Sequence, residues 1–448
     1  MVNITSTIGN SLRSYARFHP AQEALVSPGF RISYQEYESL TNQYAHYLLE
    51  QGVKKGDRVS LLIGVNASYP LSLMSLAKIG AIAVPISYHW KQELIHWALD
   101  HVETNYILVE DQYCHFIQDY IESKNIRSII VCNQHKVSSG LLEKLKGYPT
   151  TPPDIEVKPE DPCTIIFTSG TTGKPKGVVT SHNAFFAGAI TGSTTYLMHS
   201  RQLFSTPTFH MSAAFSVYTQ SYLGISLIYL PELSPESLLE TIEKERINCL
   251  ILPPNLLSIL LPIIYKSDYT LSSLKRFISG GTKVPESIIR DYKKLGFEVV
   301  QAYGATELTG PISCWNPKFG YDKIRTVGKV YLLPEVKILD PETREELPPG
   351  EVGEVAVRSP QLFTEYWKNP EETKKAFYQG WFLTGDAGRI DEQGFIEIVD
   401  RYKDVIFFSG FGGIFPGEIE DVIREMEEIE DVSVAGIHHP KWAEFPCA

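Results

Sequence analysis

The chain reads Thr168-Ser169-Gly170-Thr171-Thr172-Gly173-Lys174-Pro175-Lys176-Gly177 between two strand-like runs, Thr164–Phe167 and Val178–Val179. Its three glycines allow backbone conformations that turn successive N–H groups toward one anion. Four hydroxyls and two lysines add further donors and positive charge. The stretch therefore predicts a loop that binds polyphosphate at the end of a strand. It is not a Walker A loop, because Pro175 follows Lys174 where serine or threonine is required.

Helical and strand patterns alternate on both sides of this stretch, which is typical of α/β proteins with parallel-type sheets. The 448 residues are too many for one compact core, so we expect two or more subdomains. Helical spacing covers Tyr34–Gln51 and Glu236–Glu245. Short strands are expected at Val59–Ile63, Ala83–Ile86, Tyr106–Val109, Ser128–Val131, Cys249–Leu252, Phe277–Ile278 and Val299–Val300.

The chain changes character after Trp315, where short strands broken by Gly and Pro predict a β-rich subdomain over about residues 316–400, shaped as a distorted barrel. We expect an N-terminal domain over residues 1–400, followed by a hinge and the incomplete start of a small C-terminal α+β domain over 401–448. The elements expected in this region are strands at Val336–Leu339, Gly353–Arg358, Phe395–Ile398, Val405–Phe408 and Asp431–Ile437, and a helix at Glu418–Glu428.

Composition excludes several classes of function. The net charge of −12 argues against non-specific binding to nucleic acid or to an anionic membrane. The six cysteines form no CxxC pair, which argues against a disulfide framework or a zinc site and indicates a reducing compartment. Met1–Arg17 lacks the apolar core of a signal peptide, and the apolar stretch Leu71–Ile86 is short for a membrane span. We therefore expect a cytoplasmic protein without a transmembrane segment.

Three further motifs carry groups that suit a nucleotide. In Tyr303-Gly304-Ala305-Thr306-Glu307 the ring can stack on a purine, the hydroxyl can reach an α-phosphate and the carboxylate can hold Mg²⁺. In Thr384-Gly385-Asp386 a carboxylate at a tight turn can accept both ribose hydroxyls, although an Asx-turn alone would also explain it. Asp400-Arg401-Tyr402-Lys403-Asp404 offers an arginine for phosphates, or forms a solvated charge cluster.

Together, and in this order along the chain, these four motifs resemble the signatures of the adenylate-forming (AMP-binding) superfamily, and in particular its acyl- and aryl-CoA synthetase branch. The resemblance covers essentially the whole chain. It implies catalytic roles for Thr168, Lys174, Lys176, Thr306, Glu307 and Arg401, with Glu307 as the Mg²⁺ ligand. It implies that ATP or AMP is held by Ser169, Gly170, Thr171, Thr172, Gly173, Gly280, Gly281, Thr282, Tyr303, Gly304, Ala305 and Asp386, and that Lys403 is the hinge.

The resemblance also implies where the acid binds. One segment is Phe209–Ala214, in which Phe209, His210, Met211, Ala213 and Ala214 are expected to line the acid pocket. An aromatic or histidine residue at the position of His210 gates the acyl tunnel in CoA ligases. The other segment contains Gly280, whose missing side chain would let the acyl carbonyl pass close to the backbone. Neither segment offers an Arg or Lys for a second carboxylate, so we expect a monocarboxylic fatty or aromatic acid.

The expected reaction has two steps. The acid attacks the α-phosphate of MgATP, which gives acyl-AMP and pyrophosphate, and the thiol of CoA then takes the acyl group and releases AMP. Positioning and charge carry the first step, because a carboxylate needs no general base to attack. The expected partners are therefore the acid, ATP and CoA, and no nucleic acid. The sequence leaves open whether the protein forms a homodimer.

The sequence departs from the family pattern in two places. The superfamily carries a lysine near the end of its C-terminal domain, which contacts the α-phosphate and carboxylate during the first step, and no residue here matches it; the last lysine, Lys441, matches an earlier segment. The hypothesis is that these residues are a fragment of a longer protein, the alternative being an enzyme impaired in adenylation. The loop Gly410–Pro416 also lacks the Glu-Asn pair found in the family, which puts the thiolation site in doubt.

Three alternatives remain. An amino-acid adenylation domain would place an aspartate where His210 stands, to pair with the substrate ammonium, so an unpaired ammonium would be costly there. An acyl-AMP ligase for a carrier protein is not excluded by the sequence. A non-catalytic nucleotide-binding scaffold has no need of Thr306, Glu307, Asp386 and Arg401 together.

Overall fold

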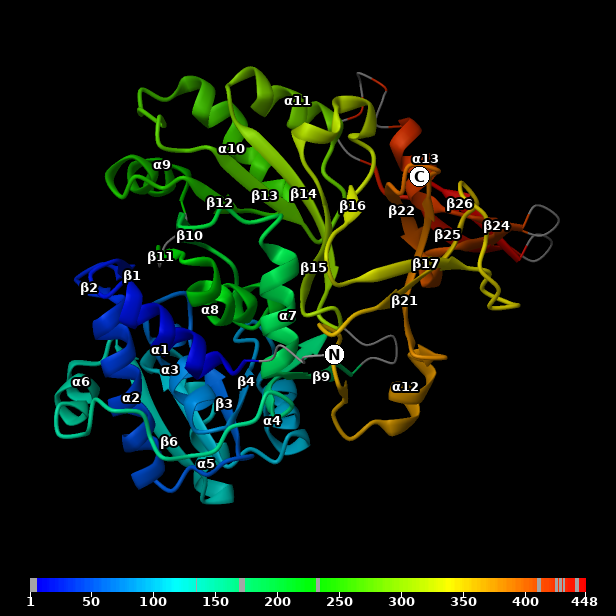
Figure 1. Ribbon diagram of the computed structural model, residues 1–448. Coiled ribbons are helices and arrows are strands. Elements are labelled where there is room, and N and C mark those ends of the chain that lie inside the picture. The colour runs from blue at the N-terminus through cyan, green and yellow to red at the C-terminus, as the bar shows by residue number, and fades with distance from the viewer. Residues whose placement is uncertain are drawn as a thin grey trace. The chain divides into compact units, whose positions relative to one another are not determined.

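The computed structural model of the protein divides into two compact units (Figure 1). It describes residues 6–133, 135–168, 174–230, 234–408, 412–423, 426, 429, 432–439 and 443–448. The first unit contains Met1–Pro317, Tyr331–Leu333 and Pro360–Pro370, and the second contains Lys318–Val330, Pro334–Ser359 and Glu371–Ala448. In the described part of the chain, no helix is long and apolar enough to cross a membrane.

The first sheet of the first unit has the strand order β19-β9-β8-β4-β3-β5-β6-β7. Its central strands are parallel, and β8 and β9 form an antiparallel hairpin beside them. The short strand β19 then pairs with the outer side of β9. The strands are β3 (Arg58–Leu62), β4 (Ile82–Pro85), β5 (Tyr106–Glu110), β6 (Arg127–Asn133), β7 (Lys136–Val137), β8 (Pro162–Thr168), β9 (Lys176–Ser181) and β19 (Glu365–Tyr366).

The second sheet of this unit joins β15, β14, β13, β12, β10, β11, β1 and β2 in that order. The pairs from β14 to β1 are parallel, and the two ends of the series are antiparallel. The strands are β1 (Glu23–Ser27), β2 (Phe30–Ser33), β10 (Arg201–Phe204), β11 (Ser226–Tyr229), β12 (Cys249–Ile251), β13 (Arg276–Gly280), β14 (Glu298–Ala305) and β15 (Gly310–Trp315).

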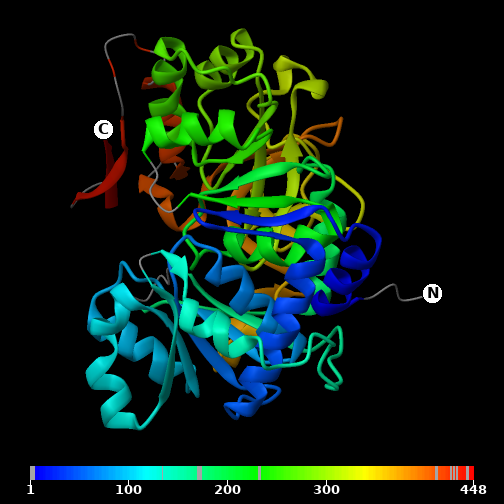
Figure 2. The ribbon, with the colours of Figure 1, turned by 90° about the vertical axis from the view of Figure 1, so that its left-hand side faces the viewer.

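Helices join these strands and cover them. In Figure 1, α7 and α8 lie between the β3–β9 region and the β10–β14 region, and one hydrophobic core there joins residues of α1, α2, α3 and α8. Figure 2 shows the same unit from the side. The helices are α1 (Ile8–Phe18), α2 (Tyr34–Glu50), α3 (Ser68–Lys78), α4 (Gln92–His101), α5 (Gln118–Lys124), α6 (Ser139–Leu145), α7 (His182–Gly192), α8 (Met211–Leu223), α9 (Pro235–Lys244), α10 (Pro254–Lys266) and α11 (Glu286–Lys294).

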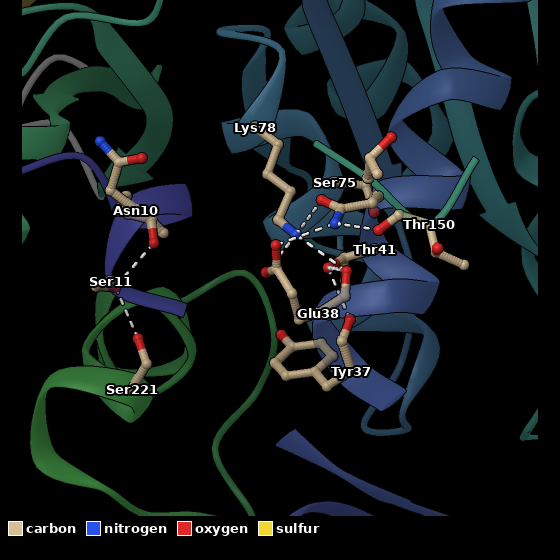
Figure 3. A network of polar contacts seen from close by, with 12 residues as sticks. Asn10, Ser11, Tyr37, Glu38, Thr41, Ser75, Lys78, Thr150 and Ser221 are labelled. Atoms are coloured by element: carbon tan, nitrogen blue, oxygen red, sulfur yellow. Dashed lines mark hydrogen bonds and ion pairs between the residues drawn. The ribbon is translucent and has the colours of Figure 1, made fainter. Parts of the chain in front are cut away.

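A polar network ties α2 to α3 inside this core (Figure 3). The Lys78 ammonium donates to the Glu38 carboxylate at 2.7 Å and to the Asn42 side-chain oxygen at 2.6 Å. Asn42 in turn donates to the Thr150 carbonyl at 2.7 Å. Burial lowers the pKa of Lys78 to about 8, so the side chain is still mostly charged at neutral pH. The network fixes the register of the two helices and anchors the chain before β8.

His182, the first residue of α7, is fully buried against the start of α1. Its Nδ1 accepts a bond from the Ile8 N–H at 3.3 Å, and burial lowers its pKa from 6.5 to about 4. Below pH 6.5 the unfolded chain therefore binds a proton that the folded protein does not bind until about pH 4. The free energy of unfolding should fall across this window by about 3 kcal/mol from this group alone.

His182→Asn tests this expectation, because the asparagine oxygen can replace Nδ1 but does not titrate. Chemical denaturation between pH 7 and pH 4 should show a shallower loss of stability in the variant than in the wild type. His46→Gln is the control, since it removes a half-exposed histidine from α2 and leaves the buried surroundings of His182 unchanged. Equal slopes for His182→Asn and the wild type would show that His182 does not set the acid limit.

The sheets of the second unit consist of antiparallel strands. Strands β17, β18, β21 and β20 pair in that order and β22 pairs with β21, while β24, β23, β26 and β25 form a separate sheet. The elements are β16 (Lys329–Val330), β17 (Glu335–Leu339), β18 (Gly353–Arg358), β20 (Phe377–Tyr378), β21 (Trp381–Ile390), β22 (Ile396–Arg401), β23 (Ile406–Phe408), β24 (Gly412–Ile414), β25 (Ala435–His439) and β26 (Ala443–Cys447), with α12 (Pro370–Lys375) before β20 and α13 (Pro416–Ile423) after β24.

The predicted α/β class and the β-rich character after Trp315 are confirmed. The helix predicted at Glu418–Glu428 starts at Pro416 and ends at Ile423 in the described residues. The strand predicted at Asp431–Ile437 runs over Ala435–His439. A domain boundary at residue 400 stays a prediction.

Candidate functional site

The phosphate-loop motif joins β8 to β9. Thr168 is the last residue of β8 and pairs with Lys176, the first residue of β9. Residues 169–173, and with them the predicted ligands Ser169, Gly170, Thr171, Thr172 and Gly173, lie outside the described residues. The Lys174 ammonium lies 5.2 Å from the centre of the Trp97 ring, and the Lys176 ammonium lies 4.9 Å from the centre of the Tyr366 ring. Both predicted lysines thus rest on aromatic rings of the same unit.

Gly177 shows why this hairpin needs a glycine. A Cβ there would lie 2.8 Å from Ile165 Cγ2 and 3.3 Å from Trp367 Cβ. The Trp367 N–H donates to the Gly177 carbonyl at 2.7 Å, and the Thr364 N–H donates to the Val179 carbonyl at 2.8 Å. The segment 360–370, which we call the strap, is therefore bound to β9 through residues 364–367.

The motif Tyr303–Glu307 ends β14 and begins a tight turn into β15. The predicted strand Val299–Val300 is longer than expected and already includes Tyr303, Gly304 and Ala305. A Cβ on Gly304 would lie 2.2 Å from the Gly310 carbonyl oxygen, so the two strands can approach only at a glycine. The turn places Thr306 and Glu307 at the end of a strand next to β13.

Glu307 is held by the strap on two sides. The Tyr366 hydroxyl donates to Glu307 Oε1 at 2.9 Å, and the Phe363 N–H donates to the Glu307 carbonyl at 2.8 Å. The Gln361 side chain donates to the Leu308 carbonyl at 2.8 Å. The structure thus brings Lys176 and Glu307 to the same tyrosine, which the sequence did not reveal.

Phe215 supports the turn from beneath. Its ring is fully buried and lies against three glycines, Gly188 and Gly192 of α7 and Gly310 of β15, which we call the glycine socket. A Cβ on Gly310 would lie 2.6 Å from the ring, and a Cβ on Gly188 would lie 2.9 Å from it. Because Gly310 pairs with Ala305, the socket fixes the strand that carries the motif.

The glycines predicted beside the acid have structural causes of their own. Gly280 ends β13, and a Cβ there would lie 2.5 Å from the Ala302 carbonyl oxygen of β14. Gly281 has φ +89° and has nothing within 4 Å of its Cβ position. Strand pairing therefore explains Gly280 without a ligand, and the roles of Gly280, Gly281 and Thr282 stay predictions.

The predicted acid segment caps α8. His210 precedes the first residue of the helix, and Met211, Ala213 and Ala214 are buried in the hydrophobic core at 6%, 0% and 0% exposure. Phe209 and His210 instead lie in an aromatic cluster with Tyr88, His89 and Tyr113. Within this segment, Phe209 and His210 are therefore the residues that lie toward the surface of the protein.

This cluster also sets the charge state of His210. Partial burial of the ring is the main cause that lowers the pKa of His210, and the electrostatic effect of His89 lowers it further. Tyr113 stacks on Tyr88 with ring centres 4.7 Å apart, and Tyr88 meets Phe209 edge-on at 5.2 Å. The lowered pKa therefore favours the neutral form of the His210 ring at physiological pH.

Near this cluster lies a buried carboxylate that sequence reasoning missed. Glu110 is fully buried at the end of β5 and accepts bonds from the Gly64 N–H at 2.8 Å and from the Asn66 side chain at 3.0 Å. The Thr208 hydroxyl donates to the Ile63 carbonyl at 2.5 Å, just before Phe209. These bonds link the ends of β3 and β5 to the start of α8.

The other predicted residues belong to the second unit. Asp386 and Arg401 are cross-strand neighbours on β21 and β22, and Arg401 Nε lies 3.0 Å from Asp386 Oδ1. The tight turn predicted for Asp386 is wrong, because the residue lies inside the ten-residue strand β21, where Gly385 has φ +72°. The carboxylate predicted for the ribose and the arginine predicted for phosphates therefore form an ion pair. Lys403 lies in the short 3₁₀ turn Tyr402–Asp404 and is exposed.

The first unit contains Glu307, the carboxylate predicted to hold a divalent cation of the magnesium type. Among the described residues no group of three or more His, Cys, Asp or Glu side chains could form a closed metal cage. Mg²⁺ usually binds one or two carboxylates and completes its shell with water and phosphates, which needs only a single oriented carboxylate. Glu307 supplies one, since the bond from Tyr366 uses one side of Oε1 and a carboxylate can accept about four bonds.

Comparisons with known proteins agree with this arrangement. The family model described as AMP-binding enzyme matches residues 12–367. A putative acyl–CoA ligase of Bacillus subtilis (strain 168) is 34% identical over 432 residues, which covers 95% of this chain and 85% of that protein. A long-chain-fatty-acid–CoA ligase of Mycobacterium tuberculosis (strain H37Rv) is 32% identical over 98% of this chain and 88% of that protein.

Solved structures give the same picture. The Mycobacterium tuberculosis fatty acyl CoA synthetase superposes with a TM-score of 0.84 at 29% identity, over 98% of this chain and 87% of that chain.

Proposed function

Because this chain belongs to the AMP-binding enzyme family, we propose that it activates a monocarboxylic acid with MgATP to acyl-AMP and then transfers the acyl group to CoA. The observation that carries the proposal is the cluster of Lys176, Tyr366 and Glu307, in which a cation and a carboxylate are oriented at the ends of β8–β9 and β14. A phosphate chain and its metal ion need such a pair of opposite charges.

The first step forms a bond between a carboxylate oxygen of the acid and the α-phosphorus, and breaks the bond from that phosphorus to the bridging oxygen of pyrophosphate. The protein needs no base, and its work is to hold the two reactants in line and to neutralise the phosphate oxygens. Lys174 and Lys176 supply positive charge, and the Thr306 hydroxyl supplies a donor. Glu307 would hold a Mg²⁺ ion, and the chemistry that the ion would supply there is positive charge to offset the charge that develops on the phosphates.

In the second step the sulfur of CoA attacks the acyl carbon and AMP leaves. The proposal assigns Asp386 to the ribose and Arg401 to the ribose and phosphates, as the family resemblance implies. Arg401 Nε lies 3.0 Å from Asp386 Oδ1, so the two side chains that the proposal assigns to the ribose lie beside each other. Lys403, two residues later, is proposed as the hinge for the change between the steps.

The proposed acid is fatty or aromatic. The aromatic cluster of Tyr88, His89, Tyr113, Phe209 and His210 contains no Arg or Lys that could pair with a second carboxylate, and the lowered pKa of His210 favours its neutral form. Two of the similar proteins are named for fatty acids. The proposal therefore covers ATP, Mg²⁺ and CoA as cofactors and co-substrate, and a monocarboxylic acid as substrate.

Thermal unfolding with non-hydrolysable acyl-AMP mimics tests the proposal. The panel contains short, medium and long fatty acyl, benzoyl and aminoacyl versions, all at one concentration, set at about a hundred times the dissociation constant of the best-bound mimic, where binding adds about 2.7 kcal/mol. Fatty or benzoyl mimics should raise the melting temperature by several degrees, and aminoacyl mimics should not. Thioester formation is then assayed from matched acyl-AMP with CoA and, in parallel, with an acyl carrier protein. No shift with any mimic or with ATP would overturn the proposal.

A further inference from the structure

The strap brings one tyrosine to two groups of the proposed site. Tyr366 is 7% exposed, and its hydroxyl donates to Glu307 Oε1 at 2.9 Å. The face of the same ring lies 4.9 Å from the Lys176 ammonium. A phenol offers both functions at once, since its hydroxyl is a donor and its ring face attracts a cation.

The backbone of the strap makes this contact rigid. Tyr366 pairs with Val178 in the β19–β9 ladder, and the residues on either side of the pair donate to β9 through the Thr364 and Trp367 N–H groups. The Phe363 ring packs on Tyr366 with centres 4.8 Å apart. The hydroxyl of Tyr366 therefore has a fixed position, and through it the carboxylate of Glu307 has a fixed direction.

We propose that Tyr366 is a positioning residue of the adenylation site, which orients Glu307 for the metal ion with its hydroxyl and Lys176 for the phosphates with its ring. The inference rests on the proposed function. A carboxylate that must bind one metal ion on a nucleotide loses affinity when it can rotate freely, and the loss of such a supporting bond typically lowers metal affinity about 10–100-fold. Under this proposal, Tyr366 itself does not contact the reacting atoms.

Two substitutions separate the two contacts. Tyr366→Phe keeps the ring and removes the hydroxyl, so it should weaken metal binding about 10–100-fold and leave the affinity for ATP without metal unchanged. Tyr366→Leu removes both contacts, so it should weaken metal binding equally and also lower the affinity for metal-free ATP. Neither change should alter the KM for the acid or for CoA.

Tyr292→Phe is a matched control. Tyr292 is fully buried in the same unit, and its hydroxyl donates to the Leu257 carbonyl at 2.9 Å, the same distance as the bond from Tyr366 to Glu307. It should lose folding stability through one lost hydrogen bond, as Tyr366→Phe does. It should not change metal binding.

The measurement is the binding of Mn²⁺ to the full chain in the presence of ATP and the absence of acid, followed by electron paramagnetic resonance of the free ion. The inference is supported if three results hold. The wild type with ATP binds Mn²⁺ more tightly than ATP alone does, Tyr366→Phe weakens this binding, and Tyr292→Phe retains it. Equal Mn²⁺ affinity in the wild type and Tyr366→Phe overturns it while the proposed function stands. If the wild type shows no ATP-dependent Mn²⁺ binding and no shift with acyl-AMP mimics, the proposed function itself has failed.

Discussion

Replacing Glu307 by glutamine is expected to slow acyl-adenylate formation by about 10²–10³-fold, a loss of roughly 3–4 kcal/mol of transition-state stabilisation. Glutamine keeps the shape of the side chain and can still accept the bond from the Tyr366 hydroxyl through its amide oxygen. The change therefore removes the negative charge and little else. The rate is read as acid-dependent exchange of pyrophosphate into ATP.

The second step serves as the internal control for this variant. Transfer from preformed acyl-AMP to CoA requires no metal on the departing pyrophosphate, so Glu307→Gln should carry it out at nearly the wild-type rate. Glu365→Gln is the second control, because Glu365 is an exposed carboxylate in the strap, next to Tyr366. If both steps fell equally in Glu307→Gln, the residue would be structural and its assignment as the metal ligand would be wrong.

Truncating Phe215 to alanine is expected to lower the free energy of unfolding by about 3–5 kcal/mol. The ring fills the glycine socket, and Gly188, Gly192 and Gly310 have no side chains that could move into the space it leaves. The cavity would therefore persist instead of collapsing, which places the cost in the upper part of the usual range. Urea denaturation of the two proteins measures it.

Two further variants make this expectation specific. Phe18→Ala removes the same number of atoms from a ring that is 72% exposed, so it should change stability by less than about 0.5 kcal/mol. Phe215→Ala combined with Gly192→Ala should recover part of the loss, because the added methyl group, 3.2 Å from the ring in the wild type, would enter the cavity. A cost below about 1 kcal/mol for Phe215→Ala alone would mean that the socket collapses.

The elements that the sequence predicted well are those with strong local patterns. The helix expected at Tyr34–Gln51 runs over Tyr34–Glu50, and the strand expected at Gly353–Arg358 has those bounds in the structure. Ser33 and Glu36 form a capping box at the start of that helix, which a short stretch of sequence specifies by itself. The phosphate-loop motif likewise has its predicted strands on both sides.

The contacts that complete the site were not predictable in this way. Tyr366 lies 59 residues after Glu307, and nothing local to either residue indicates the bond between them. Gly177 reads as part of the phosphate loop, yet a Cβ there would meet Ile165 of β8 and Trp367 of the strap. Asp386 reads as a turn residue because glycine precedes it, but the pairing of β21 with β22 keeps it in a strand beside Arg401. Tertiary pairing decides each of these cases, and a single sequence does not record it.

The strap has a consequence for the order in which the protein can be made. Until residues 364–367 have been translated, β9 has no partner strand on the side away from β8. This edge therefore presents Val178 and Val179 and their backbone groups to other chains. Translation at about 5–20 residues per second adds the stretch between Glu307 and Tyr366 in about 3–12 s. For those seconds a nascent chain that has already completed most of the first unit carries an open sheet edge, which is a binding site for chaperones and a starting point for aggregation.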